Sequence, residues 1–367
     1  MLRLKASLFA STLIASSAAP AMAEVNVVAS IKPVHSLVAA VMEGVGTPEL
    51  IVQGAGSPHN YALKPSQAQS LQDADVVFWI GHQLEAFLEG PVETLAASAK
   101  SIEMIDAHDL IKLEFREGGA FDAHDHSDHD DHGHSEAAEA DHDHDHDHGH
   151  KETAEAEHDH DHGNEETAKV EHDHDDDHGH EETADAGHDD HDHGEFDAHI
   201  WLDPQNAKAM VHEIEEALAE ADPANAAAYE ANAEALMTKL DALTTELKAE
   251  LEPVHDKGFV VFHDAYQYFE NRFDVNASGS ITISPEIMPS AARVAEIRER
   301  VQDLGATCVF SEPQFEPKLV ATVTEGTSAA SGVLDPLGAS LDDGPELYFD
   351  LIRNMATSIK NCLSEPS

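Results

Sequence analysis

Short apolar runs alternate with amphipathic stretches along most of the chain. The apolar runs predict strands in two groups, Val25–Ser30, Glu49–Val52 and Val76–Ile80, then Gly258–Phe262, Gly305–Phe310 and Gly332–Leu334. Apolar residues at helical spacing predict helices over Val34–Met42, Ala291–Leu304 and Pro345–Leu363. Strands that alternate with helices are typical of an α/β fold with mostly parallel sheets.

One long amphipathic pattern separates the two groups of strands. Asp222-Pro223 supplies an N-cap and a first-turn proline, and Pro253 ends the pattern. Between them, apolar residues recur every three or four positions, at Tyr229, Ala233, Leu236, Leu240, Leu243, Leu247 and Leu251. A helix over 223–252 is about 45 Å long. We therefore predict two α/β lobes, 24–222 and 253–367, each a mostly parallel sheet flanked by helices, joined by one long rigid helix.

An acidic, histidine-rich segment interrupts the first lobe between Asp122 and Gly194. It holds 20 of the 28 histidines and 29 acidic residues, against two lysines. Because it has almost no large apolar residue, it cannot bury enough surface to offset the entropy of ordering, and we predict a disordered loop. The net charge of the chain, −53, argues against a nucleic-acid binder, which needs basic residues to meet phosphates.

Residues 1–23 have the pattern of a secretory signal peptide. Arg3 and Lys5 precede an apolar run over Leu8–Ile14, and Ala21-Met22-Ala23 forms a small-residue cleavage site. No later apolar stretch is long enough to span a bilayer. Export to an oxidising compartment predicts a disulfide between Cys308 and Cys362, with two buried free thiols as the alternative.

Several chemically active side chains follow predicted strands. Because ligands of open α/β sheets bind beyond the carboxyl ends of the strands, His263, Glu312 and Asp335 are predicted to share a cleft. The first lobe offers His59, after a Gly- and Pro-rich loop, and His199, before an apolar run. These three histidines are 140 and 64 residues apart, so spacing alone does not show that they converge. Each of them could also be a structural residue.

The acidic segment is a second candidate for metal binding, by composition. His-Asp-His-Asp blocks start at residues 144, 158 and 172, and neutral imidazole is a preferred ligand of zinc, copper and nickel. The candidate ligands are His124, His126, His129, His142, His144, His146, His148, His158, His160, His162, His172 and His174. A solvated acidic spacer is the alternative. Each site should be weak, because an unfolded chain must be ordered around each ion.

Sequence motifs of metal-dependent and serine hydrolases give no support for an enzyme. His124-x-His126-x-Asp128-His129 matches a metallo-β-lactamase pattern, but it lies in a tract where such matches arise by chance and lacks the preceding strand. The chain contains neither HExxH nor GxSxG. Neither a zincin nor an α/β-hydrolase is therefore supported. The prediction that the protein is not an enzyme rests on the two-lobed organisation, the export signal and a family resemblance.

Six short motifs, in this order, resemble those of the periplasmic zinc-binding proteins of bacterial ABC importers, in the cluster of zinc and manganese substrate-binding proteins. They are Val28-Ala29-Ser30-Ile31-Lys32-Pro33, Pro58-His59-Asn60-Tyr61-Ala62-Leu63-Lys64-Pro65-Ser66, Asp197-Ala198-His199-Ile200-Trp201-Leu202-Asp203-Pro204, Phe262-His263-Asp264-Ala265-Tyr266-Gln267-Tyr268-Phe269, Ser311-Glu312-Pro313-Gln314-Phe315 and Leu334-Asp335-Pro336-Leu337-Gly338. The resemblance covers essentially the whole chain after the signal peptide. It implies two α/β lobes joined by a long helix, with a metal between the lobes.

Carried over by position, the resemblance implies metal ligands at His59, His199 and His263, with Asp335 at the fourth position. Manganese members have a carboxylate where this chain has His263, which favours zinc. Some zinc members have Glu directly before the first ligand, where this chain has Pro58. The fourth ligand is left open between water, Asp335 and a histidine of the loop.

The function implied is a periplasmic substrate-binding protein, a monomer that does not span the membrane. It would capture Zn²⁺ at one tight site, hold further ions weakly in the loop, and deliver zinc to the permease of an ABC importer. A manganese-binding protein of the same fold and a periplasmic zinc buffer are the alternatives.

Overall fold

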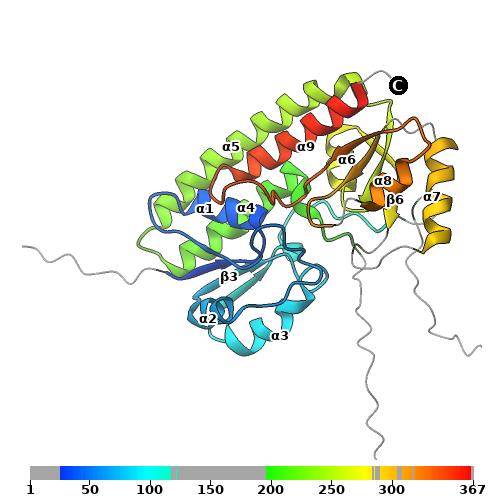
Figure 1. The fold of residues 1–367 in the computed structure, drawn as a ribbon. Coiled ribbons are helices and arrows are strands. Elements are labelled where there is room, and N and C mark those ends of the chain that lie inside the picture. The colour runs from blue at the N-terminus through cyan, green and yellow to red at the C-terminus, as the bar shows by residue number, and fades with distance from the viewer. Residues whose placement is uncertain are drawn as a thin grey trace, which may run out of the picture. The chain divides into compact units, whose positions relative to one another are not determined.

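Two four-stranded parallel sheets form the framework of the computed structural model (Figure 1). The structure describes residues 25–116, 121, 196–282, 285, 290–303, 308–315 and 318–364. The predicted signal peptide and the predicted ligands of the acidic segment lie outside these residues. The fold class predicted from the sequence, two α/β lobes with parallel sheets, is confirmed.

The first sheet has the strand order β2-β1-β3-β4. Its strands are β1 (Val27–Ala29), β2 (Glu49–Leu50), β3 (Val76–Trp79) and β4 (Lys100–Glu103). The helices between them are α1 (Lys32–Val41), α2 (Pro65–Asp73) and α3 (Ala86–Leu95), and the short helix η1 (Met104–Asp106) follows β4. The inner strands β1 and β3 are fully buried, as expected of continuous apolar runs in a parallel sheet.

The second sheet has the strand order β6-β5-β7-β8. Its strands are β5 (Gly258–His263), β6 (Asn276–Thr282), β7 (Cys308–Ser311) and β8 (Ala330–Val333). Its helices are α6 (Gln267–Phe273), α7 (Ala291–Asp303), α8 (Lys318–Thr324) and α9 (Leu347–Ser364). The inner strands β5 and β7 end at His263 and Ser311, so their carboxyl ends lie at one edge of the sheet.

The long helix between the sheets follows a shorter one. After the short helix η2 (Ile200–Leu202), α4 (Pro204–Ala221) is followed by α5 (Ala226–Leu251), and η3 (Glu252–Val254) leads into β5. The long helix begins at Ala226, three residues after the predicted start at Pro223, because Asp222 caps the end of α4 and a short turn follows it. The 26 residues of α5 span about 39 Å. All seven residues of the predicted apolar stripe are buried.

The terminal helix α9 ties the second sheet to the first lobe. It packs against α1 and α5, and Figure 1 shows it alongside α5. One hydrophobic core therefore runs through both lobes, whereas a smaller cluster fills the space between the second sheet and helices α7 and α8. No helix in the described residues has the length and apolar character needed to cross a membrane.

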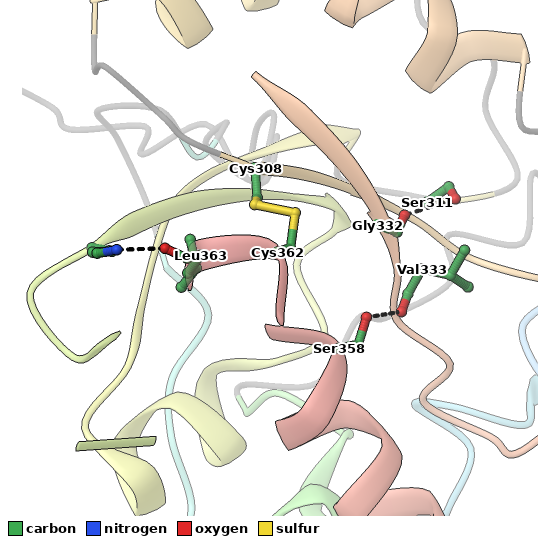
Figure 2. Close-up of a disulfide and its surroundings, with 8 residues drawn as sticks. Cys308, Ser311, Gly332, Val333, Ser358, Cys362 and Leu363 are labelled. Carbon is green, nitrogen blue, oxygen red and sulfur yellow. Dashed lines mark hydrogen bonds between the residues drawn. A yellow bond between two sulfur atoms is a disulfide. The ribbon is translucent and has the colours of Figure 1, made fainter. Parts of the chain in front are cut away.

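A disulfide joins Cys308 at the start of β7 to Cys362 near the end of α9 (Figure 2). The two Cα atoms are 6.1 Å apart, and both side chains are buried. The hydroxyl of Ser358, one turn before Cys362, donates to the carbonyl of Val333 at the end of β8, 2.6 Å away. The disulfide predicted from the two cysteines is confirmed.

Candidate metal centre

Three histidines from distant parts of the chain converge between the two lobes. His59 lies in a turn between β2 and α2, His199 directly precedes η2, and His263 ends β5. One ring nitrogen from each lies within 4.8 Å of the other two. His199 and His263 are buried and His59 is half-buried. The structure thus brings together three of the four ligand residues predicted from the sequence.

The spacing of the rings suits a tetrahedral cation. Zinc binds imidazole nitrogens at about 2.0–2.1 Å, so two nitrogens of a tetrahedral site are about 3.3 Å apart. The Nε2 atoms of His199 and His263 are separated by 3.4 Å. These two side chains therefore need little rearrangement to share one metal ion.

A carboxylate contacts the outer nitrogen of each buried ring. Oδ1 of Asp197 lies 2.6 Å from Nδ1 of His199 and also accepts the backbone N–H of that residue. Oε1 of Glu312 lies 2.7 Å from Nδ1 of His263. The amide of Gln267 donates to the second oxygen of Asp197, 2.9 Å away. Both Nδ1 atoms are thus engaged by acceptors, which leaves the two Nε2 atoms facing each other.

The sequence predicted that Glu312 lies in the cleft but did not predict its partner. The contact between Asp197 and His199 was not predicted. The spacing Asp197-x-His199 was a usable signal, because an acid two residues before a histidine can reach its ring. The pairing of Glu312 with His263 had no such signal, since it depends on β7 lying beside β5.

Asp335 is not part of the group. Its oxygens accept hydrogen bonds from the side-chain amide of Gln314 at 2.9 Å and from three backbone N–H groups, those of Leu337, Gly338 and Ala339. Gly338 has a φ of +71°, a conformation that glycine allows and that this turn requires. Asp335 therefore caps a turn, and the geometry does not support it as the fourth metal ligand.

The walls of the pocket around the three rings are largely apolar and come from both lobes. Besides the histidines, the pocket is lined by Ser57, Pro58, Trp201, Phe315, Pro336 and Leu337, among others. Trp201 is fixed in this wall because its Nε1 donates to the carbonyl of Pro336 at 2.8 Å. An apolar wall has a low dielectric constant, which strengthens electrostatic interactions inside the pocket.

The other five histidines that the structure describes lie outside this group. His35 is buried, its Nε2 contacts the carbonyl of Pro48 at 3.0 Å, and burial lowers its pKa. His212 is exposed on α4 beside Glu215 and Glu216. Within the described residues, the three rings between the lobes form the one candidate metal-binding group of three or more ligands.

The two sheets, the long helix and the histidines between the lobes define a two-lobed protein with a site suited to a divalent cation. Two solved structures share the fold. One, named "Crystal structure of ZnuA", has a TM-score of 0.65 and 22% identity, covering 93% of this chain and 99% of that one. The other, a Mn-bound periplasmic metal-binding protein from Candidatus Liberibacter asiaticus, has a TM-score of 0.61 and 20% identity, covering 92% and 99%.

Sequence comparison identifies the family. Residues 27–362 match the family described as zinc-uptake complex component A, periplasmic, and the chain belongs to this family. It is 52% identical over 340 residues to the high-affinity zinc uptake system protein ZnuA of Brucella suis biovar 1 (strain 1330), covering 93% of this chain and 92% of the relative. The family resemblance inferred from the six motifs is thereby confirmed.

Proposed function

We propose that the chain captures Zn²⁺ between its two lobes and delivers it to the permease of an ABC importer. The observation that carries this proposal is the convergence of three imidazoles, two of them buried, in a member of a zinc-uptake family. In this proposal His59, His199 and His263 are the protein ligands, and water completes the tetrahedron. The role is to bind and release the ion and not to catalyse a reaction.

The donor set supports zinc over manganese. Three neutral imidazole nitrogens suit zinc, whereas manganese prefers more oxygen ligands. The two carboxylates nearest the rings, those of Asp197 and Glu312, face the Nδ1 atoms, on the far side of each ring from the convergent Nε2 atoms. Since the fold is shared with a manganese-bound protein, the donor atoms and not the architecture carry this choice.

The place and partners of the protein follow from the same family assignment. The relative from Brucella suis is named as part of a high-affinity zinc uptake system, which supports a permease as the partner rather than a free zinc buffer. We propose that residues 1–23 direct export to the periplasm and that the chain works there as a monomer. The histidines of residues 122–194 supply additional weak zinc sites and stay outside the tight site.

Zinc titration of the full chain, with a chelating indicator as competitor, tests the tight site without interference from weak ones. We expect one tight zinc per chain, bound in preference to Mn²⁺. His263→Ala should lower the zinc affinity more than a hundredfold, because one of few metal bonds is lost. His212→Ala is the matched control, since it removes an exposed histidine outside the pocket. Equal affinity of His263→Ala and the parent chain, or preference for Mn²⁺, would contradict the proposal.

A further inference from the structure

A buried glutamate contacts the far side of the His263 ring. Glu312 follows β7, and β7 pairs with β5, so the side chain reaches His263 across 49 residues of sequence. Its Oε1 lies 2.7 Å from Nδ1 of His263 and 3.4 Å from the backbone nitrogen of that residue. Only 1% of the Glu312 side chain is exposed, so water does not compete for these contacts.

This contact decides which nitrogen of the His263 ring carries the proton. A carboxylate only accepts hydrogen bonds, so in the neutral ring Nδ1 is protonated and Nε2 keeps its lone pair. Nε2 is the atom that lies 3.4 Å from Nε2 of His199, on the side facing the candidate metal position. Glu312 thus selects both the tautomer and the ring orientation that a metal requires.

The best-formed hydrogen bonds of the Glu312 carboxylate go to His263 and not to the surrounding loops. Among the described residues, Oε2 of Glu312 makes no hydrogen bond of good geometry. Burial, and then the Glu312 carboxylate, raise the pKa of the Tyr266 phenol, so Tyr266 is a second neighbour of this carboxylate. Glu85 is a contrasting case. It is also fully buried, but its oxygens accept from the hydroxyl of Ser30 and from the backbone N–H groups of Ile80 and Gly81. Glu85 holds its own loops together, whereas Glu312 makes its two hydrogen bonds of good geometry to His263.

We propose that Glu312 is a positioning residue for metal capture: it does not touch the ion but holds Nε2 of His263 toward it. The inference rests on the proposed function, since it gives His263 the role of a zinc ligand. Partners that orient metal-bound histidines typically change metal affinity 10- to 100-fold. Loss of the Glu312 carboxylate should weaken zinc binding by this factor.

Two variants and a matched control separate positioning from general destabilisation. In the full chain, Glu312→Ala should weaken zinc binding 10- to 100-fold in chelator competition. Glu312→Gln should lose less, because the amide oxygen still accepts from Nδ1–H. Glu85→Gln alters an equally buried carboxylate in the other lobe and should leave the zinc affinity within twofold of the parent.

A spectroscopic measurement addresses the tautomer directly, without zinc. Nitrogen-15 NMR of the metal-free chain, with the His263 signals identified by their loss in His263→Gln, should show Nδ1 protonated in the parent. A proton on Nε2 instead, or zinc binding by Glu312→Ala within twofold of the parent, would overturn the inference. If Glu312→Ala does not fold, the tautomer of the parent decides. If the parent binds no zinc tightly, the proposed function fails, and the tautomer still tests the contact with Glu312.

Discussion

The disulfide between Cys308 and Cys362 gives a quantitative test of how α9 is held to the second sheet. We consider the replacement of both cysteines by alanine, and separately the reduction of the parent chain. The bond closes a loop with a sequence separation of 54 residues. In the chain-entropy model a loop of this length stabilises the folded state by about 4 kcal/mol.

The position of the bond makes this stabilisation matter for both lobes. Since α9 packs on α1 and α5, loosening its end weakens contacts in the core that the lobes share. For a domain of roughly this size, 1 kcal/mol corresponds to about 2–4 °C, so the midpoint of thermal unfolding should fall by about 8–16 °C.

Urea unfolding of the oxidised parent, the reduced parent and the Cys308→Ala/Cys362→Ala variant measures the effect. Ser358→Ala is the control, because it removes one hydrogen bond between α9 and the end of β8 and should cost only about 1 kcal/mol. Thiol titration of the unreduced, denatured chain should find no free thiol. Identical unfolding of oxidised and reduced protein, or two titratable thiols, would refute the reasoning.

Three further changes have predictable results. Burial raises the pKa of Glu85 from 4.5 to about 7, so the folded state holds this proton more tightly than the unfolded state. Relative to Glu85→Gln, the parent should therefore lose about 3 kcal/mol of unfolding free energy as the pH rises from 4.5 to 7. Urea unfolding of both proteins at pH 4.5 and pH 7 measures this loss, and its absence would contradict the prediction. Arg116 binds Asp264 and the buried Glu270, so Arg116→Met should cost about 3 kcal/mol near neutral pH. Desolvation already raises the pKa of Glu270, so without Arg116 this carboxyl is more readily protonated at pH 5. The loss of stability in Arg116→Met should therefore be smaller at pH 5 than at neutral pH, and an equal loss at the two pH values would argue against the pairing. Deleting residues 122–194 should remove the weak zinc sites and leave one tight zinc per chain in calorimetry. In the parent, the weak sites should be lost below the ordinary imidazole pKa near 6.5, because protonated imidazole does not bind metal. Loss of the tight zinc in the deletion variant would place the loop in the main site.

The segments with continuous or periodic apolar residues were the most predictable parts of the fold. Continuous apolar runs marked β1, β3 and β5, and the stripe on α5 was found at all seven positions. The missed strands β4 and β6 are edge strands. Although β6 (Asn276–Thr282) is mostly buried, its residues are small or polar apart from Ile281, so its sequence resembles a loop.

The candidate site was predictable only in part, for a related reason. The histidines follow strand ends or flank apolar runs, and family motifs carried them over by position. The carboxylate on His263 depends on strand order, which no local periodicity contains. For Asp335 the family match concerned position alone, and the orientation of its carboxylate is set by the backbone N–H groups of the turn after it.

The way the lobes are joined bears on how a metal can enter. Lys32 of α1 is buried and its ammonium donates to the carbonyl of Leu341, while the backbone N–H of Tyr348 on α9 donates to the hydroxyl of Ser36. The hydroxyl of Tyr348 in turn donates to the carbonyl of Trp201, in the wall of the metal pocket. The two bonds of Tyr348 are buried in the core that both lobes share, so separating the lobes would expose that core to water. In the proposed function, capture of an ion therefore depends on the side chains and turns at the pocket, where carboxylates already hold the rings of His199 and His263 in place.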